Sequence, residues 1–204
     1  MKKIIFTLLI LTGIVTAGMA QINIKPAFGV NSGRLSTDPG DWQHDGRLGY
    51  QFGGSVAIGK KFYVEPGIFW MRNNSEISHL GGDGGTSGAI NFNHNISMIR
   101  VPVFVGYAIL GNEESLADLR VFLGPSMSFI TGVDNGEEHP EAPLKEDYKS
   151  VRWGGDVGLG VSVWWLFLDV GYEFGLSNIY KDTDKYGSAK ASGIWTNIGV
   201  RIRL

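Results

Sequence analysis

Apolar and polar side chains alternate along most of the chain with a period of two. In residues 48–59, for example, Leu48, Tyr50 and Phe52 fall on one face, whereas Gly49, Gln51 and other small or polar residues fall on the opposite face. This spacing is typical of β-strands, and the spacing of amphipathic helices is scarce. The alternation predicts eight strands, at residues 22–31, 48–59, 62–73, 97–109, 119–129, 151–163, 166–177 and 194–204.

The connections between these strands alternate strictly between short and long. Residues 59–61, 110–118 and 164–165 are comparatively short, whereas residues 32–47, 74–96, 131–150 and 178–192 are long and polar. Each strand is close to the roughly 9–11 residues that cross a bilayer at a tilt. The pattern therefore predicts an all-β fold, an eight-stranded antiparallel up-and-down transmembrane β-barrel with three short periplasmic turns and four long extracellular loops.

The composition of the two strand faces indicates which one points outward. One face is aliphatic and aromatic, and the other is rich in glycine and serine and poor in the Lys and Glu that cover water-facing surfaces. A secreted barrel of the lipocalin type, with its apolar face inside, is the alternative. Small residues suit the narrow lumen of an eight-stranded barrel, so we expect the apolar face to contact lipid.

Charged side chains of both signs fall on the predicted inward face. Unpaired charges in a dry interior are very costly, so these residues are expected to form a pairing network that fills the lumen. An ion pathway is the alternative, which the small radius of an eight-stranded barrel disfavours. The predicted network comprises Lys25, Glu65, Arg100, Arg120, Arg152, Asp156, Asp169, Glu173, Arg201 and Arg203.

Aromatic residues gather where the predicted strands meet turns or loops. Outer-membrane barrels carry aromatic residues around their circumference at both interfaces between membrane and water, so these residues predict an aromatic girdle. Its members are Tyr50, Phe62, Tyr63, Trp70, Tyr107, Trp153, Trp164, Trp165 and Tyr180. Four prolines, Pro26, Pro66, Pro102 and Pro125, lie inside predicted strands, where each removes a hydrogen-bond donor, so bulges or local breaks are expected there.

The first twenty residues have the pattern of a secretory signal peptide. Lys2 and Lys3 precede an apolar stretch at residues 4–15, and small residues precede a cleavage site after Ala20. The apolar run is shorter than the ~20 residues of a spanning helix. The expected domains are therefore a cleaved signal peptide, residues 1–20, and a barrel, residues 21–204. Loss of the two lysines changes the formal net charge from −2 to −4.

Composition excludes several other classes of protein. The 204 residues include 30 Gly and no Cys, and the mean hydropathy is 0.00. The absence of Cys excludes disulfides, thiolate metal sites and cysteine nucleophiles. The slightly negative charge argues against nucleic acid as a partner, because phosphate-binding surfaces are basic. Nothing in the sequence points to a cofactor.

Four short motifs resemble the PorT-like outer-membrane β-barrel family, whose architecture is related to that of the OmpA and OmpX barrels. They lie at residues 64–67 (VEPG), 99–103 (IRVPV), 123–125 (LGP) and 156–161 (DVGLGV), in the order and spacing of that family. The resemblance implies a bacterial outer-membrane location in contact with lipid and lipopolysaccharide. That family includes barrels of unknown role and one linked to protein secretion, so a secretion or surface protein is an open partner.

The last residues resemble the signal that the barrel-assembly machinery reads during biogenesis. Asn197, Gly199, Ile202 and Leu204 supply the polar residue, the glycine and the alternating hydrophobic end. The chain ends in Leu instead of the commoner Phe. The resemblance implies the assembly machinery as a transient partner.

All four histidines, His44, His79, His94 and His139, lie in the predicted long loops. Ser78 and His79 with Asp83, or His94 with Ser97, would suit a lipid A-modifying enzyme, but catalysis needs these groups within hydrogen-bond reach of one another. An acidic group, Asp134, Glu137, Glu138 and Glu141, would be solvated or bridge cations to lipopolysaccharide. Asp182 and Asp184 resemble the start of a calcium loop whose later ligands are missing.

The sequence thus favours a monomeric barrel, closed to solutes and non-enzymatic, with a structural or surface-interaction role. An accessory component of a secretion machinery is the first alternative, and a lipid A-modifying enzyme is the second.

Overall fold

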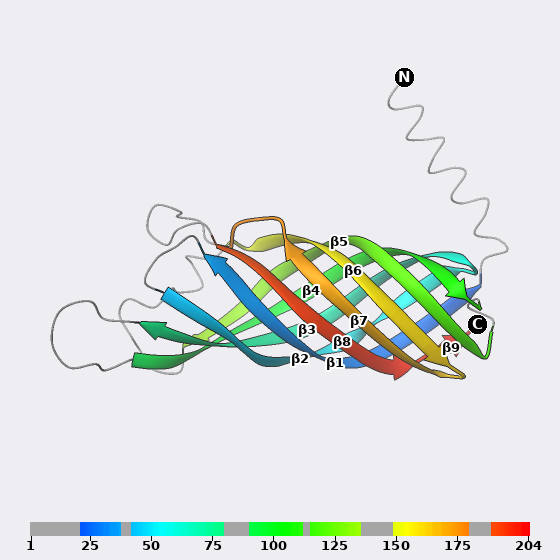
Figure 1. Ribbon diagram of the computed structural model, residues 1–204, viewed down its shortest axis with the longest axis horizontal. Helices are drawn as coiled ribbons and strands as arrows, with labels where there is room; N and C mark the ends of the chain where they lie inside the picture. The colour runs from blue at the N-terminus through cyan, green and yellow to red at the C-terminus, as the bar shows by residue number, and fades with distance from the viewer. Residues whose placement is uncertain (1–20, 38–41, 80–89, 112–114, 136–148, 180–188) are drawn as a thin grey trace, which may run out of the picture.

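The computed structural model describes residues 21–37, 42–79, 90–111, 115–135, 149–179 and 189–204, with side chains described in 21–33, 48–74, 95–111, 115–133, 149–179 and 190–204. The strands form one closed antiparallel barrel (Figure 1). They are β1 (Ile22–Thr37), β2 (Trp42–Gly59), β3 (Phe62–His79), β4 (Ile90–Leu110), β5 (Ala117–Asn135), β6 (Val151–Val163), β7 (Leu166–Gly175), β8 (Ala189–Val200) and β9 (Ile202–Arg203). From β1 to β8, each strand pairs with the next along the chain, and β1 closes the barrel by pairing with β8 as well as β2.

The short strand β9 is the continuation of β8. Both pair with β1 in one register, which runs through Ala27↔Gly199 and Ile24↔Ile202. The ladder is broken between these pairs, next to Pro26, which has no N–H to donate. The barrel therefore has eight strands and an up-and-down order, as the alternation predicts. In the part of the chain that the structure describes, no helix has the length and apolarity to span a membrane.

The two ends of the barrel differ in their connections. At one end, here the turn end, β2 and β3 are joined by Lys60 and Lys61, β4 and β5 by residues 111–116, and β6 and β7 by Trp164 and Trp165. Gln21 and Leu204 also lie at this end (Figure 1). Trp164 has a φ of 65°, which is unusual for a bulky residue. The opposite end, here the loop end, carries residues 38–41, 80–89, 136–150 and 176–188.

Several strands extend further toward the loop end than the sequence predicts. Residues 32–37, 42–47, 74–79, 90–96 and 131–135, which are predicted as loop, continue the strands, and β1 and β2 are joined by residues 38–41 alone. One of the four loops is therefore short. Backbone hydrogen bonds between strands form whether or not one face is apolar. Where a strand continues beyond the lipid, both faces can be polar, so the alternation of apolar and polar residues that predicts a strand disappears.

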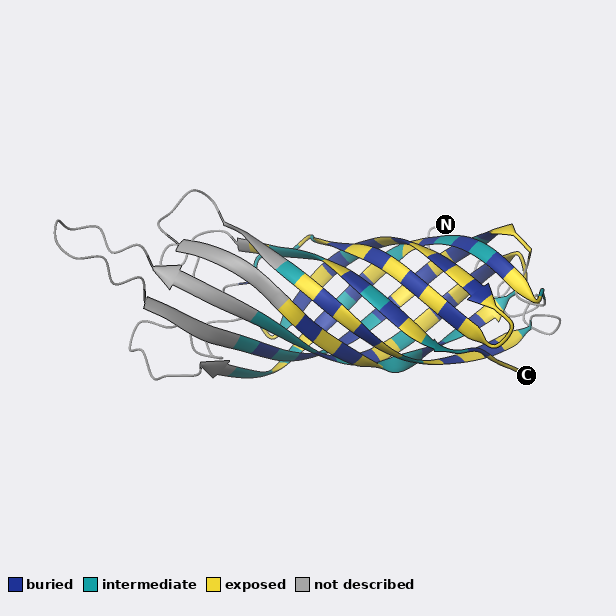
Figure 2. Cartoon of the chain, turned by 60° about the horizontal axis from the view of Figure 1, so that its bottom comes forward, coloured by how far each residue is buried: buried dark blue, intermediate teal, exposed yellow. Residues whose placement is uncertain are grey.

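The observed burial follows the predicted faces. Figure 2 shows buried residues alternating with exposed or intermediate ones along the strands that face the viewer. The exposed positions are apolar, as at Phe28, Leu123 and Leu159, whereas inward positions such as Lys25 and Arg100 are almost fully buried. A barrel that is apolar outside and charged inside is arranged for lipid and not for water.

The strand prolines interrupt the ladders without changing their register. Between β3 and β4, for example, Pro66↔Val103 and Phe69↔Arg100 belong to one register, but the pairs between them, beside Pro102, are missing. Similar gaps lie beside Pro26, Pro66 and Pro125. The local breaks expected at these prolines are present. The three register shifts in the described ladders occur elsewhere, at Arg47/Tyr50, Ser97/Met98 and Ala108/Leu110.

Candidate functional site in the barrel lumen

The lumen at the turn end is filled by ion pairs that join strands from all sides of the barrel. The Lys25 ammonium on β1 donates to Glu65 of β3 at 2.8 Å and to Asp169 of β7 at 3.0 Å. The Ser55 hydroxyl donates to the same Glu65 carboxylate. One lysine therefore links three strands that are distant in sequence, and it does so at a position almost without solvent access.

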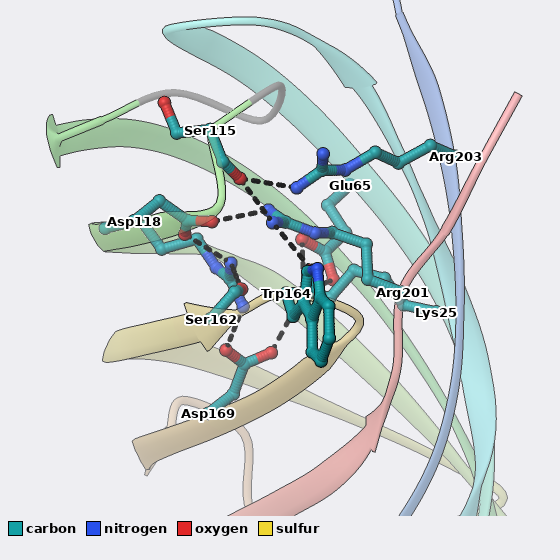
Figure 3. Close-up of polar contacts among 10 residues, drawn as sticks. Lys25, Glu65, Ser115, Asp118, Ser162, Trp164, Asp169, Arg201 and Arg203 are labelled. Atoms are coloured by element: carbon teal, nitrogen blue, oxygen red, sulfur yellow. Dashed lines mark hydrogen bonds and ion pairs between the residues drawn. The ribbon is translucent and has the colours of Figure 1, made fainter.

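Two arginines complete this group. The Arg120 guanidinium lies 2.7 Å from Asp118 and 2.6 Å from Asp169, and it also donates to Ser162. Arg201, in the break between β8 and β9, pairs with the other oxygen of Asp118 and donates to the carbonyl oxygens of Ser115 and Trp164 (Figure 3). We call Lys25, Glu65, Asp118, Arg120, Asp169 and Arg201 the turn-end network.

A second group lies further toward the loop end. The Arg100 guanidinium pairs with Asp156, and its Nε lies 2.9 Å from Glu173, which also pairs with Arg152 at 3.1 Å. The Trp195 indole N–H donates to Asp156 at 2.9 Å. We call Arg100, Arg152, Asp156 and Glu173 the middle network. Its two cations balance its two carboxylates.

A layer of aromatic rings separates the two networks. The Trp195 ring stacks at 5.9 Å on Phe104 and at 5.8 Å on Phe122. Along β5, Phe122 follows Asp118 and Arg120 of the turn-end network on the same inward face. The ring of Phe167 lies 4.5 Å from the Lys25 ammonium, within the range of a cation–π contact.

Inward glycines make room for these rings. A methyl group at Gly171 would overlap the Trp195 ring, and one at Gly158 would overlap Phe122. Gly106 faces Tyr63 in the same way. The sequence predicts small inward residues because the lumen is narrow, and the structure adds that each of these three glycines accommodates one particular ring.

An apolar cluster lies on the loop-end side of the middle network. Ile179, in the connection after β7, is 2% exposed and packs with Met71, Ile96 and Met98. We call these four residues the loop-end plug. Backbone hydrogen bonds join the segment that carries Ile179 to β6 and to the residues before it. The Leu176 N–H donates to the Trp153 carbonyl at 3.0 Å, and the Lys149 N–H donates to the Ile179 carbonyl at 2.8 Å.

The buried charges of the described residues balance. Five buried cations face five buried carboxylates: Lys25, Arg100, Arg120, Arg152 and Arg201 against Glu65, Asp118, Asp156, Asp169 and Glu173. Each is within ion-pair distance of a partner of opposite sign. The buried ion pairs of the described residues therefore carry no formal net charge.

Nine of the ten residues predicted for the interior network lie inside the barrel, and one does not. Arg203 is exposed, because it lies beyond the closed part of the barrel, where its guanidinium reaches the Ser115 carbonyl at the rim. Asp118 is missing from the prediction because it falls in a predicted turn. Its position two residues before Arg120, on the same face of a strand, is the signal that would have placed it inside. Nothing in the sequence pattern marks Ile179.

One residue of the predicted girdle is misplaced. Tyr63 is 2% exposed and points inward, because it alternates with the outward Phe62 and Val64. Tyr180 lies outside the described residues. The other members surround the two ends: Phe62, Tyr107, Trp164 and Trp165 toward the turn end, and Tyr50, Trp70 and Trp153 toward the loop end. Their role at membrane interfaces stays a prediction.

Most of the remaining candidate residues lie where the structure describes no side chains. The side chains of His44, His79, His94 and His139, and those of Ser78, Asp83 and the acidic group of residues 134–141, lie outside the described parts of the chain, as do residues 1–20. Asn197 of the predicted assembly signal is buried and accepts a hydrogen bond from Gln51 at 2.6 Å, and Ile202 and Leu204 are exposed. Recognition of this end of the chain by an assembly machinery stays a prediction.

Comparison with known proteins agrees with this architecture. Residues 18–181 match the family model described as outer membrane protein beta-barrel domain. The crystal structure of the outer membrane protein OprG from Pseudomonas aeruginosa is similar with a TM-score of 0.55 and 14% identity, over 91% of this chain and 96% of that one. Ail, the attachment invasion locus protein of Yersinia pestis, solved with the heparin analogue sucrose octasulfate, gives 0.47 and 11%, over 89% and 99%. No curated protein sequence matches the chain.

Proposed function

Because the chain belongs to the outer-membrane β-barrel domain family, we propose that it is a solute-impermeable, non-enzymatic barrel that holds its loop end outside the cell as an interaction surface. The observation that carries this proposal is the filled lumen. Two charge-balanced networks, an aromatic layer and the loop-end plug follow one another along the axis. Eight strands leave an interior just wide enough for side chains, and here side chains occupy it.

The lumen is suited to rigidity and not to transport. A permeation path needs groups that bind a solute weakly and in sequence, with water between them. The buried cations of this lumen are instead held by carboxylates at ion-pair distance, and the rings of Phe104, Phe122 and Trp195 contact one another directly. A rigid interior would fix the positions of the strand ends from which the loop-end connections emerge.

Conductance across a planar bilayer tests impermeability. The mature barrel, inserted at the density at which an open porin gives current steps, is expected to give none. A heat-dependent shift in gel migration confirms that the inserted protein is folded. Regular current steps from folded wild-type protein would contradict the proposed closure.

The interaction role is tested by capture of partners from detergent-solubilised outer membranes. A matched variant replaces residues 80–89 and 136–148 by glycine–serine segments and keeps the barrel. Partners captured by the wild type and lost with this variant support a surface-interaction role. Subunits of a secretion apparatus retained by both forms would favour the PorT-like alternative, in which the barrel itself is recognised.

The absence of enzymatic activity is tested on the lipid that such a barrel would meet. We expect identical lipid A mass spectra from cells with and without the gene. A reproducible change in acyl number or phosphate content would favour the lipid A-modifying alternative instead.

A further inference from the structure

The pairing of β1 with β8 closes the barrel, and we call this pairing the seam. The other pairings from β1 to β8 join strands that follow one another along the chain, whereas the seam joins Ala27 to Gly199. Closing a long loop costs more conformational entropy than closing a short one, and strand pairs that are distant in sequence form slowly. The seam is therefore the pairing that most needs stabilising contacts besides its backbone hydrogen bonds.

Two cations lie opposite each other at the break in the seam ladder. The register on both sides of the break places Lys25 opposite Arg201, and both side chains are buried. In the seam ladder that the structure describes, neither residue is paired, and the Arg201 N–H donates instead to the Trp165 carbonyl at 2.7 Å. Like charges at opposed positions of neighbouring strands repel one another, so the two cations by themselves would push the seam apart.

The carboxylates that hold these cations come from strands away from the seam. Lys25 pairs with Glu65 of β3 and with Asp169 of β7. Arg201 pairs with Asp118 of β5 (Figure 3). Within the turn-end network, strands β2 to β7 therefore supply three carboxylates but one cation, a formal charge of −2. The two seam cations balance this charge only once β1 and β8 have both joined the barrel.

The middle network is not divided in this way. Its cations and carboxylates all lie on β4, β6 and β7, and they balance one another without a charge from β1 or β8. A charge balance that depends on the seam is thus confined to the turn-end network. This is also the part of the barrel where the seam ladder is broken.

We propose that Lys25 and Arg201 act as an electrostatic latch that holds the seam closed. The two cations repel one another across the break, and each is held by carboxylates that reach it through the lumen from β3, β5 and β7. The seam strands are thereby tied to the rest of the barrel wall at the point where they lack backbone pairs. The latch is independent of the proposed impermeability, because it concerns the contact between β1 and β8 and not the width of the lumen.

Hydrogen exchange of the mature barrel in detergent micelles, followed by mass spectrometry, tests the latch. The measured quantity is the exchange rate of peptides from β1 and β8 relative to that of peptides from β3 and β4. K25M and R201M are each expected to raise this ratio by at least about tenfold, because loss of one latch cation leaves excess negative charge buried and the seam opens locally. Unchanged ratios in both variants would overturn the proposal.

R120M and R152M provide matched controls. Each also removes a buried cation, one from the turn-end network and one from the middle network, but neither residue lies on a seam strand. Both variants are expected to unfold at lower denaturant concentration than the wild type and to keep its exchange ratio. A rise in R120M as large as that in K25M would overturn the latch, because the network would then stabilise the whole barrel and not the seam.

A disulfide across the seam covers the case in which a latch variant does not fold. The chain contains no Cys, and Ile24 and Ile202 are paired across the seam with exposed side chains, so I24C/I202C introduces a single bond at this position. The oxidised bond is expected to restore the folded yield and the exchange ratio of K25M and R201M, and its reduction to abolish both effects. No restoration of these two variants, or an equal gain in stability of R120M, would overturn the proposal.

Discussion

The two ends of the lumen contain side chains of different chemistry. At the turn end, three cations and three carboxylates join β1, β3, β5, β7 and the β8–β9 break through direct ion pairs. At the loop end, aliphatic and thioether side chains pack around Ile179. Near these residues, the side-chain amide of Asn31 has no hydrogen-bond partner among the described residues, and it lines a cavity of about 30 Å³ together with Asn73 and Ser192.

The ion pairs of the turn end and the apolar contacts of the loop end contribute to stability in different ways. Buried ion pairs fix the positions of their side chains. Loss of one partner strongly lowers the free energy of unfolding of the protein, because the other charge stays buried without compensation. Apolar contacts are less directional and lose free energy in proportion to the surface that is removed. We therefore expect the turn end to be sensitive to single charge deletions, and the loop end to respond gradually.

The largest effect is expected for Arg120→Met. This change leaves the carboxylates of Asp118 and Asp169 without one of their cations, in a place without solvent, and should lower the free energy of unfolding by about 3–5 kcal/mol. Urea unfolding in lipid vesicles, followed by tryptophan fluorescence, measures it. Recovery of stability on adding Asp169→Asn would show that the excess negative charge left in the turn-end network is responsible. A loss below about 1 kcal/mol would mean that the network contributes little.

A smaller effect is expected for Ile179→Ala at the loop-end plug. Removal of a buried aliphatic side chain that packs against Met71 and Met98 should cost about 2 kcal/mol. Leu176→Ala, at an exposed position of the same segment, is the matched control and should cost little. If both variants behave alike, the segment does not close the lumen in the membrane.

A further loss of stability is expected when a side chain is added to Gly171, which accommodates the Trp195 ring. Gly171→Ala should cost about 1–3 kcal/mol and change the near-ultraviolet circular dichroism, because its methyl group overlaps the indole ring. Gly155→Ala provides the comparison, since its methyl group would lie 3.7 Å from Leu176, at ordinary contact distance. Equal stability of the two variants would be incompatible with the observed ring position.

The smallest effect is expected at the rim. Arg203→Gln removes an exposed charge that donates to the Ser115 carbonyl at the rim, so the free energy of unfolding should change by less than about 0.5 kcal/mol. Arg201→Gln, two residues earlier, should be clearly more harmful because it leaves Asp118 with one cation fewer. Similar losses for both would remove the distinction between rim and network.

The sequence predicts the barrel body well, since lipid outside and a narrow lumen inside impose opposite requirements on alternate residues. Inward Lys25, Glu65 and Asp169 are recognisable from this parity alone. The strand extensions toward the loop end are not recognisable, because alternation disappears where both faces are polar. The girdle prediction includes Tyr63 because it lies near a turn, although its alternation with Phe62 and Val64 places it inside.

The strand number, the apolar outward face and nine of the ten buried charges of the described residues follow from local periodicity and are predictable from the sequence. The tertiary structure sets which charges pair, because Lys25 meets Asp169 and Arg201 meets Asp118 through barrel closure, across long stretches of chain. It also decided that Ile179 enters the lumen and that Asp118 belongs to the turn-end network. Such contacts depend on the register and curvature of all eight strands together, which no local pattern contains.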